Sequence, residues 1–312
     1  MFGPVIDIIL PIFGILLIGY GTASLGWFDK SAVTGLTRYI FDFAVPMLLL
    51  RTLASTTLPD VIPWAYLASY YFGTLIVLVA GFALNYLFWH RSFSERVISA
   101  FSGCFSNTVL LGIPIIMLAF GEQAKLPLFI IIGTHGLVMI PVFTILLEMG
   151  KSGRAPITTM INRTLFGLIT NPLIIGLLSG LACNMLDITL WKPLDEMAKL
   201  LGDSVTPGAL FALGATLAGF RNNIRWQEVP VFVIMKTMLH PLAVWGLAVL
   251  VFDIKESLWI QVLVMIAAQP TGVNPFLFAC RYNVGQSVSS GTVFLSTIIS
   301  IFSLSILLAI FQ

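Results

Sequence analysis

Two stretches of the sequence place amides, hydroxyls, glycines and prolines in the middle of otherwise apolar segments. Proline removes a backbone donor and glycine permits unwound backbone, so each segment is predicted to split into two half-helices. Backbone groups freed in hydrocarbon need partners, which favours an arrangement in which the two interruptions meet around a small polar cavity. The N-termini of the half-helices would direct partial positive charge into this cavity. The predicted chemistry is therefore binding of an anion, above all a carboxylate.

The candidate substrate-binding residues come from these two interruptions. They are Asn107, Thr108, Gly112, Pro114, Gln269, Pro270, Thr271, Asn274 and Pro275. Glycine and proline also occur in membrane helices that only kink or pack closely, and one interruption alone would favour that interpretation. Two interruptions at corresponding places, each flanked by amides and hydroxyls, favour a binding site instead.

Four ionisable side chains lie inside apolar segments, where charge is costly and is a functional candidate by default. Asp42 and Asp203 each precede a proline by four residues. They would bind a coupling cation or proton, or cap and pair structurally. Lys236 is expected to pair with Asp203 rather than to attract the substrate. His135 is expected to be a hydrogen-bonded core histidine, with proton relay as the alternative, and His240 is interpreted as structural.

The composition indicates the elements that position these residues. Of 312 residues, 58% are hydrophobic and only 10% are charged, against about a quarter charged in soluble domains. Seven uncharged runs are long enough to cross a bilayer: 8–28, 61–89, 97–121, 126–147, 164–186, 257–280 and 282–312. Three more segments are apolar with a charged residue in their interior: 36–54 with Asp42, 199–220 with Asp203 and 229–252 with Lys236. The prediction is an all-α integral membrane protein with ten transmembrane helices.

Charge and cysteine usage exclude several classes of partner. The net charge of +2, without a basic stripe, argues against nucleic acid. Cys104, Cys183 and Cys280 have no metal-ligand or disulfide spacing and are expected to be buried apolar residues. No metal or cofactor is expected. A coupling ion, H⁺ or Na⁺, stays open.

The basic residues predict the orientation in the membrane. With the N-terminus outside, ten Lys and Arg residues fall in inner connections and five in outer ones. The inner ones are Lys30, Arg38, Arg91, Arg96, Lys151, Arg154, Arg163, Arg221, Arg225 and Arg281. The positive-inside rule then places both termini outside the cytoplasm, in a multi-pass protein of the cell membrane.

The two halves of the sequence resemble each other. An offset of 161 pairs Gly19 with Gly180 and Asp42 with Asp203, and an offset of 163 pairs Thr108 with Thr271 in the later segments. The predicted domains are a first five-helix repeat over 1–150, a short cytoplasmic linker over 151–163 and a second repeat over 164–312. Five spans per repeat invert the second half, and the broken helices four and nine would cross.

These motifs resemble the auxin efflux carrier family, which includes plant auxin exporters and bacterial carriers of malonate- or malate-like acids. The residues that carry the likeness are Pro46, Asn107, Thr108, Leu111, Gly112, Pro114, Lys236, Pro241, Pro270 and Asn274. The resemblance implies a scaffold from segments one, two, six and seven, and a transport unit from three to five and eight to ten. It also implies a homodimer, elevator-type movement, and a bound carboxylate bordered by Asn107, Pro114, Pro270 and Asn274. The short central loop fits the bacterial-type branch better than the plant exporters.

The predicted function is secondary transport of a small organic carboxylate, with no enzymatic activity. One alternative is a sodium-coupled symporter of larger organic anions that resembles the bile-acid symporters. A remote alternative is an intramembrane hydrolase that uses Ser179 or Ser290 with His135 or His240, although the sequence contains no recognised catalytic motif. A channel would need a continuous polar path and would show conductance rather than saturable flux.

Overall fold

Long apolar runs leave the backbone no partner except itself, and the chain accordingly folds as helices. The computed structural model describes residues 2–55, 63–150, 166, 169–220 and 224–311. The predicted linker 151–163 and the start of the sixth segment lie outside the described residues. Within the described ranges the chain is all-helical, and extended pairing is limited to one isolated bridge between Ser106 and Thr271. The predicted all-α class is confirmed.

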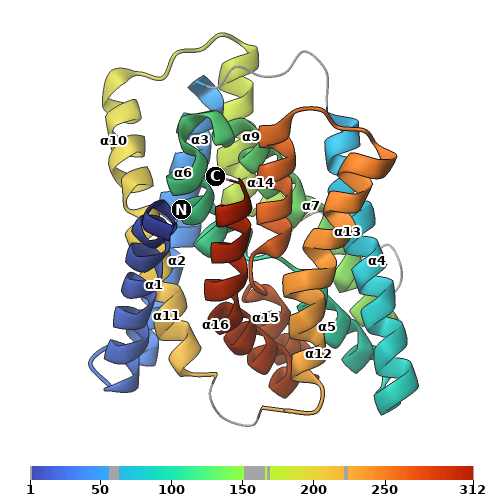
Figure 1. The fold of residues 1–312 in the computed structure, drawn as a ribbon. Helices are drawn as coiled ribbons and strands as arrows, with labels where there is room; N and C mark the ends of the chain where they lie inside the picture. Colours follow the sequence, from blue (N-terminus) through green and yellow to red (C-terminus); the bar gives the residue numbers. More distant parts are fainter. Residues whose placement is uncertain (1, 56–62, 151–165, 167–168, 221–223, 312) are drawn as a thin grey trace.

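The helices follow one another in short steps along the chain (Figure 1). In order, they are α1 Phe2–Ser24, α2 Lys30–Tyr39, η1 Ile40–Ala44, α3 Val45–Ser55, α4 Trp64–Trp89, α5 Phe93–Cys104, η2 Thr108–Gly112, α6 Ile113–Phe120, η3 Gly121–Ala124, α7 Lys125–Met149, α9 Pro172–Met185, α10 Lys192–Asp203, α11 Val205–Ala218, α12 Val229–Ile234, η4 Met235–Leu239, α13 His240–Gly246, η5 Leu247–Val251, α14 Ser257–Ala268, α15 Asn274–Tyr282 and α16 Gln286–Phe311.

Seven helical stretches in the described residues are long and apolar enough to cross a membrane. The three expected segments with an interior charge all lie in such stretches: Lys30–Ser55, Lys192–Ala218 and Val229–Val251. Two further apolar helices, Pro172–Met185 and Ser257–Ala268, are shorter. The chain is therefore a multi-pass membrane protein.

Close helix pairs organise one side of the molecule. Helix α1 packs along α11, and α3 packs along α9 and α10. Glycine makes these approaches close, because a Cβ on Gly19 would collide with the carbonyl oxygen of Phe211, and one on Gly180 would lie 2.6 Å from that of Leu50. The other side holds α4 against α5 and α13, and α16 against α12 and α15 (Figure 1).

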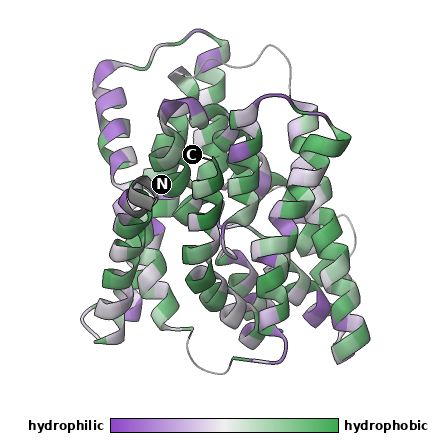
Figure 2. Ribbon diagram, viewed as in Figure 1, coloured by the Kyte–Doolittle hydropathy of each residue, from purple (hydrophilic) through white to green (hydrophobic). Residues whose placement is uncertain are grey.

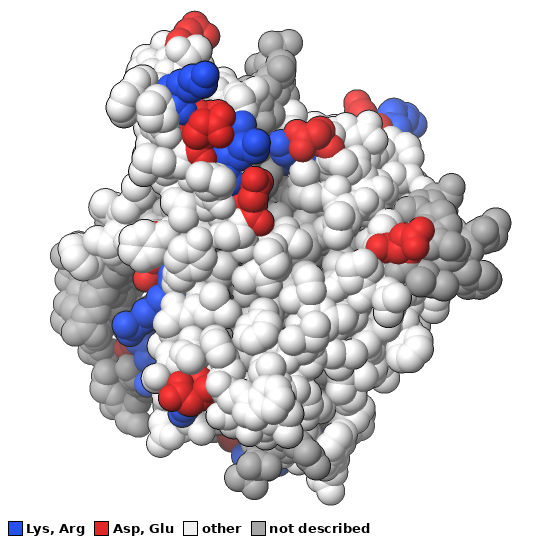
Figure 3. Space-filling model, turned by 90° about the vertical axis from the view of Figure 1, so that its left-hand side faces the viewer, with Lys and Arg blue, Asp and Glu red and all other residues white. Residues whose placement is uncertain are grey.

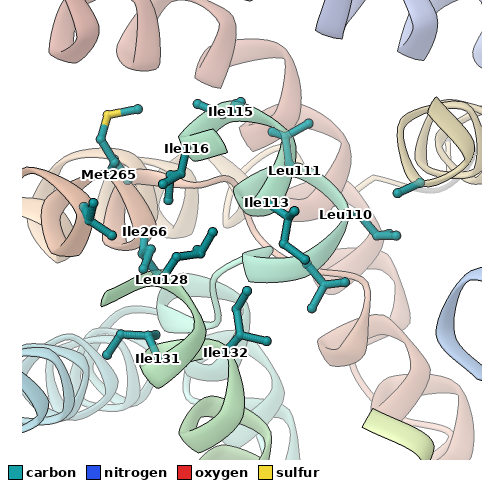
Figure 4. Packing of buried hydrophobic residues seen from close by; sticks show 14 of the residues in the cluster. Leu110, Leu111, Ile113, Ile115, Ile116, Leu128, Ile131, Ile132, Met265 and Ile266 are labelled. Carbon is teal, nitrogen blue, oxygen red and sulfur yellow. The ribbon is translucent and has the colours of Figure 1, made fainter. Parts of the chain in front are cut away.

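The central core packs around the residues that follow the first interruption. Leu111, Ile115 and Ile116 of η2 and α6 lie beside α7 and α14, where Ile131 and Ile266 are also fully buried (Figure 4). This packing fixes the short helices on either side of the interruption, because each is too short to be stable alone.

The surface matches a bilayer. Hydrophobic residues dominate the middle of the long helices, and hydrophilic residues gather at their ends and on α10 (Figure 2). One face of the molecule shows a broad uncharged belt below the charged upper end (Figure 3). Both chain ends lie in the upper half of Figure 1, whereas the turn after α1 and the loop before α12 lie at the lower end.

The cysteines only partly follow the sequence interpretation. Cys104 is buried, but Cys183 is half-buried and Cys280 is exposed. The expectation of three buried cysteines was wrong for Cys280, because an apolar run does not reveal which side of its helix faces the protein.

Candidate functional site

The two interruptions meet in the middle of the molecule. The first separates α5 from η2 and the second separates α14 from α15. The backbone N–H of Asn107 donates to the Pro270 carbonyl at 2.9 Å, and the N–H of Gly272 donates to the Phe105 carbonyl at 3.0 Å. Each unwound segment thus satisfies backbone groups of the other, as hydrocarbon surroundings require.

Side chains brace this crossing from behind. The Thr271 hydroxyl donates to the Ser102 carbonyl at 2.7 Å, and the Thr271 N–H donates to the Ser296 hydroxyl at 3.0 Å. Gln269 donates to the Met265 carbonyl at 3.1 Å. Thr271 and Gln269 are both fully buried. Thr271 thus holds the second interruption in place, whereas the buried Oε1 of Gln269 has no hydrogen-bond partner among the described residues.

Prolines and glycines act differently in the two interruptions. Gly112 and Pro114 are helical, in η2 and the first turn of α6, so the unwound residues are 105–107, ahead of the expected Gly-x-Pro. Because η2 runs directly into α6, Pro114 lies inside a continuous helix, directly after a π-helical turn in which the Gly112 N–H donates to the Asn107 carbonyl five residues earlier. Pro270 lies in the unwound segment, whereas Pro275 lies in the first turn of α15.

A cavity of about 930 Å³ adjoins the crossing. Of the predicted substrate-binding residues, Asn107, Thr108 and Asn274 line it. The others do not: Gly112, Pro114, Gln269, Pro270, Thr271 and Pro275 lie behind its wall. The cavity continues past α2 to the turn after α1, where Asp29, Lys30 and Arg38 also line it.

Asn107 has an amide nitrogen without a partner at this wall. Its Oδ1 accepts the Leu110 N–H at 3.2 Å and so caps η2. Its Nδ2 is buried and, like the neighbouring Ser106 Oγ, has no hydrogen-bond partner within the described residues. A buried donor of this kind costs free energy until something accepts its hydrogen bond. The arrangement fits a ligand with acceptor oxygens.

Two half-helices begin at the cavity. Helix η2 continues into α6 from Thr108, and α15 starts at Asn274, so first-turn N–H groups of both face the same region. At the cavity's other end, the pKa of Asp29 is lowered because the Ala32 N–H and the Ser31 hydroxyl donate to its carboxylate. The starts of helices are places where negative charge is favoured.

Comparisons with known proteins agree over nearly the whole chain. Residues 4–308 match the family described as membrane transport protein. The chain is 26% identical over 298 residues to a Rhizobium meliloti (strain 1021) protein whose name proposes it as a malonate transporter, covering 94% of this chain and 92% of that protein. It is 23% identical over 344 residues to auxin efflux carrier component 8 of Arabidopsis thaliana, covering 93% of both.

The chain belongs to the auxin efflux carrier family of membrane transport proteins. The predicted resemblance is therefore confirmed, and so is the assignment as a transporter rather than an enzyme. The lysosomal cholesterol signaling protein of Mus musculus is also similar, at 25% identity over 244 residues, which cover 74% of this chain and 27% of the mouse protein.

The ionisable candidates of this family member do not form one group. Asp42 in η1 is exposed and lines the cavity, whereas Asp203 at the end of α10 is exposed and lies outside its lining. His135 lines the cavity, is 2% exposed, and lies with its Nδ1 3.3 Å from the Tyr70 hydroxyl.

Lys236 does not pair with Asp203 as expected. Its ammonium donates to the Ala267 carbonyl and lies 3.1 Å from Nδ1 of His240. No ion pair of Lys236 occurs in the part of the chain that the structure describes. The sequence did hold a signal for the contact with His240, because residues four apart lie on one helix face. The carbonyl partner on α14 left no such signal.

Proposed function

We propose that this family member is a secondary transporter of small organic carboxylate anions that binds its substrate at the crossing. Asn107 carries the proposal, because it lines the cavity beside two half-helix starts and has a buried amide nitrogen without a hydrogen-bond partner among the described residues. A substrate carboxylate would accept from this amide and from first-turn N–H groups. Binding at such a site needs no buried arginine.

The charged side chains of the cavity balance one another. Lys30 and Arg38 line it together with Asp29 and Asp42, so the support for an anion comes from the helix starts at the crossing rather than from the charge of the lining. The name of the Rhizobium meliloti relative suggests malonate as the first compound to test.

The full architecture that we propose has ten membrane segments in two inverted five-helix repeats. Its support is a contact that recurs at the offset of 161: Gly19 approaches the carbonyl of Phe211, and Gly180 approaches that of Leu50. The same offset relates both the glycines and their partners. The close pairs α1–α11 and α3–α9 then form the scaffold of the first, second, sixth and seventh segments.

We propose elevator-type alternating access between this scaffold and the remaining helices. The cavity supports the proposal because residues of α2, α9 and α11 line one wall and residues of both interruptions line the other. A substrate bound there would move with the crossing relative to the scaffold. A homodimer in which the scaffold supplies the contact is consistent with the family resemblance.

The orientation that we propose has both termini outside the cytoplasm of the cell membrane. Arg91 and Arg225 lie in the connections before α5 and α12, Arg96 lies in the first turn of α5, and Lys30 begins α2 at the lower end of Figure 1. Positive charge favours the cytoplasmic side. The cavity, which reaches Lys30, is then open to the cytoplasm.

Uptake of radiolabelled malonate and indole-3-acetate into proteoliposomes tests the function. Asn107→Ala should reduce saturable uptake about ten- to a hundredfold, because a hydrogen bond to a charged group contributes about 1.5–3 kcal/mol. Asn107→Asp is the sharper variant, since it keeps the Oδ1 that caps η2 but replaces the donor with a negative charge.

Thermal unfolding provides the control for these variants. Asn107→Asp should unfold near the wild-type temperature and still lose uptake. If both variants bound the substrate as tightly as the wild type, the substrate would not bind at Asn107. Steady conductance without saturation or counterflow would instead indicate a channel.

A further inference from the structure

An arginine is stacked on aromatic rings where α4 ends and α5 begins, at the lower end of Figure 1. The Arg96 guanidinium lies over the ring of Tyr86, 4.6 Å from its centroid, and 5.5 Å from the centroid of Phe82. Its Nε donates to the Arg91 carbonyl at 2.7 Å. These contacts hold the planar group in one place, since the face of an aromatic ring attracts a cation.

The carboxylates at this end of the molecule are bound to other arginines. Arg91 donates to Glu228 at 2.7 Å. Arg225 donates to Glu95 at 3.1 Å and lies 3.5 Å from Glu228. No salt bridge among the described residues includes Arg96. Arg96 therefore carries the excess positive charge of these five side chains.

The face of α4 beneath this arginine is exposed where a bilayer would lie. Helix α4 is the apolar stretch Trp64–Trp89, which is long enough to cross a membrane. Tyr86 is 53% exposed, and Val79, seven residues earlier on the same helix face, is 58% exposed. Phe88 near the end of the helix is exposed as well. In a multi-pass protein such a face lies against lipid, so Arg96 is at the edge of a lipid-facing surface.

The arginine lies at the level of the lipid headgroups. Tyr86 belongs to the last turn of α4, and Trp89 is its last residue. Tyrosine and tryptophan gather where a transmembrane helix meets the headgroups. Arg96 lies in the first turn of the next helix, and the apolar stem of an arginine can run along aromatic rings while its charge reaches polar surroundings. The negative group at this level of a bilayer is the lipid phosphate.

A phosphate diester fits the free edge of the guanidinium. The only hydrogen bond of Arg96 among the described residues uses Nε, which leaves the two Nη groups. Those groups form a planar fork that binds two phosphate oxygens at once. The acyl chains of the same molecule would pack along Tyr86 and Val79. A soluble phosphate would gain only the contact with the fork, so the surface favours a lipid.

We propose that Arg96, Tyr86 and the lipid-facing side of α4 form a binding site for an anionic phospholipid. The headgroup phosphate accepts from the Nη groups of Arg96, and the acyl chains lie along α4. The site is separate from the cavity at the crossing, whose lining includes neither Arg96 nor Tyr86. It does not rest on the proposed transport function.

Native mass spectrometry of the full chain in detergent micelles tests the site, with phosphatidylglycerol as the probe and phosphatidylcholine as the neutral comparison. The wild type should retain phosphatidylglycerol in preference to phosphatidylcholine. Arg96→Met keeps an apolar stem but loses the charge, and should bind phosphatidylglycerol at least about fivefold more weakly, as expected for one basic residue at an anionic membrane surface. Tyr86→Leu removes the ring beneath the guanidinium and should also weaken this binding.

A second substitution covers a failure of the methionine variant to fold. Arg96→Lys keeps the charge without the planar fork and should bind phosphatidylglycerol more weakly than the wild type. Melting temperatures in phosphatidylcholine show which variants are folded. Phosphatidylglycerol should raise the melting temperature of the wild type and raise that of Arg96→Met less.

The matched control is Arg281→Met, which removes an exposed arginine from the last turn of α15. Among the described residues, Arg281 has neither a salt bridge nor an aromatic ring beneath it. This variant should retain phosphatidylglycerol as the wild type does. An equal loss in Arg281→Met and Arg96→Met would show that the lipid responds only to net charge, and would overturn the site.

Two further outcomes would also overturn the site. One is unchanged binding of phosphatidylglycerol in the folded Arg96 variants. The other is binding of free glycerol phosphate as tightly as phosphatidylglycerol, because the ligand would then be a soluble phosphate rather than a lipid.

Discussion

The two interruptions both break a helix at the crossing, but different side-chain contacts stabilise them. In the first, the Asn107 side chain caps η2, and its amide nitrogen is buried without a partner among the described residues. In the second, the α15 start has no side-chain cap, and the buried Thr271 is bonded to Ser102 and Ser296. The Asn107 amide thus keeps one group unpartnered within the described residues, whereas the Thr271 hydroxyl is bonded within the protein.

The ends of the helices that precede the interruptions differ in their partners as well. The Ala267 carbonyl in the last turn of α14 accepts from the Lys236 side chain, whereas the Ser102 carbonyl in the last turn of α5 accepts from the Thr271 hydroxyl. The two related interruptions are therefore braced by different groups.

The largest contrast should appear in cysteine labelling on either side of the crossing. Cys104 ends α5 and is buried, whereas Cys280 lies in α15 and is exposed. In a Cys183→Ser background, a membrane-impermeant maleimide should label Cys280 from the cytoplasmic face and leave Cys104 unmodified until the protein unfolds. Mass spectrometry of inside-out and right-side-out vesicles gives both readouts. Labelling of Cys280 only from the outer face would reverse the proposed orientation.

Matched threonine substitutions compare the two interruptions directly. Thr271→Val deletes the donor to the buried Ser102 carbonyl, which should lower the free energy of unfolding by about 1–3 kcal/mol. Thr108→Val changes a side chain at the cavity wall that makes no hydrogen bond of its own within the described residues. It should leave stability nearly unchanged and weaken substrate binding.

Denaturant unfolding and malonate binding, measured on both threonine variants, separate these effects. An equal loss of stability in Thr108→Val would contradict the division between a ligand-facing interruption and a structural one.

How far the sequence predicts this site depends on the kind of residue. Proline and glycine act on their own backbone, so two interruptions in apolar segments could be placed from the sequence, although the first begins ahead of Gly112. Which side chains face the cavity depends on the rotation of each helix. Gln269 and Thr271 therefore looked like ligands, and Lys236 looked like a partner for Asp203.

Family membership could be predicted from spacing, because the motifs at Asn107 and Asn274 are specific. The architecture could be predicted more easily than the contacts. Helices follow from long apolar runs, whereas the Lys236–Ala267 contact joins two segments that share no local pattern.

The smallest effect is expected at the exposed cap that parallels Asn107. Asp29 caps α2 by accepting the Ala32 N–H at 2.7 Å, and this bond lowers the pKa of its carboxyl. A lowered pKa in the folded state means that the stabilisation is present at neutral pH and is lost as the pH falls through that pKa. Asp29→Ala should therefore lower the melting temperature slightly at pH 7, and the difference from wild type should shrink toward zero in acid. A difference that grows on acidification would show that the charged carboxylate is not what caps the helix, and the parallel with Asn107 would fail.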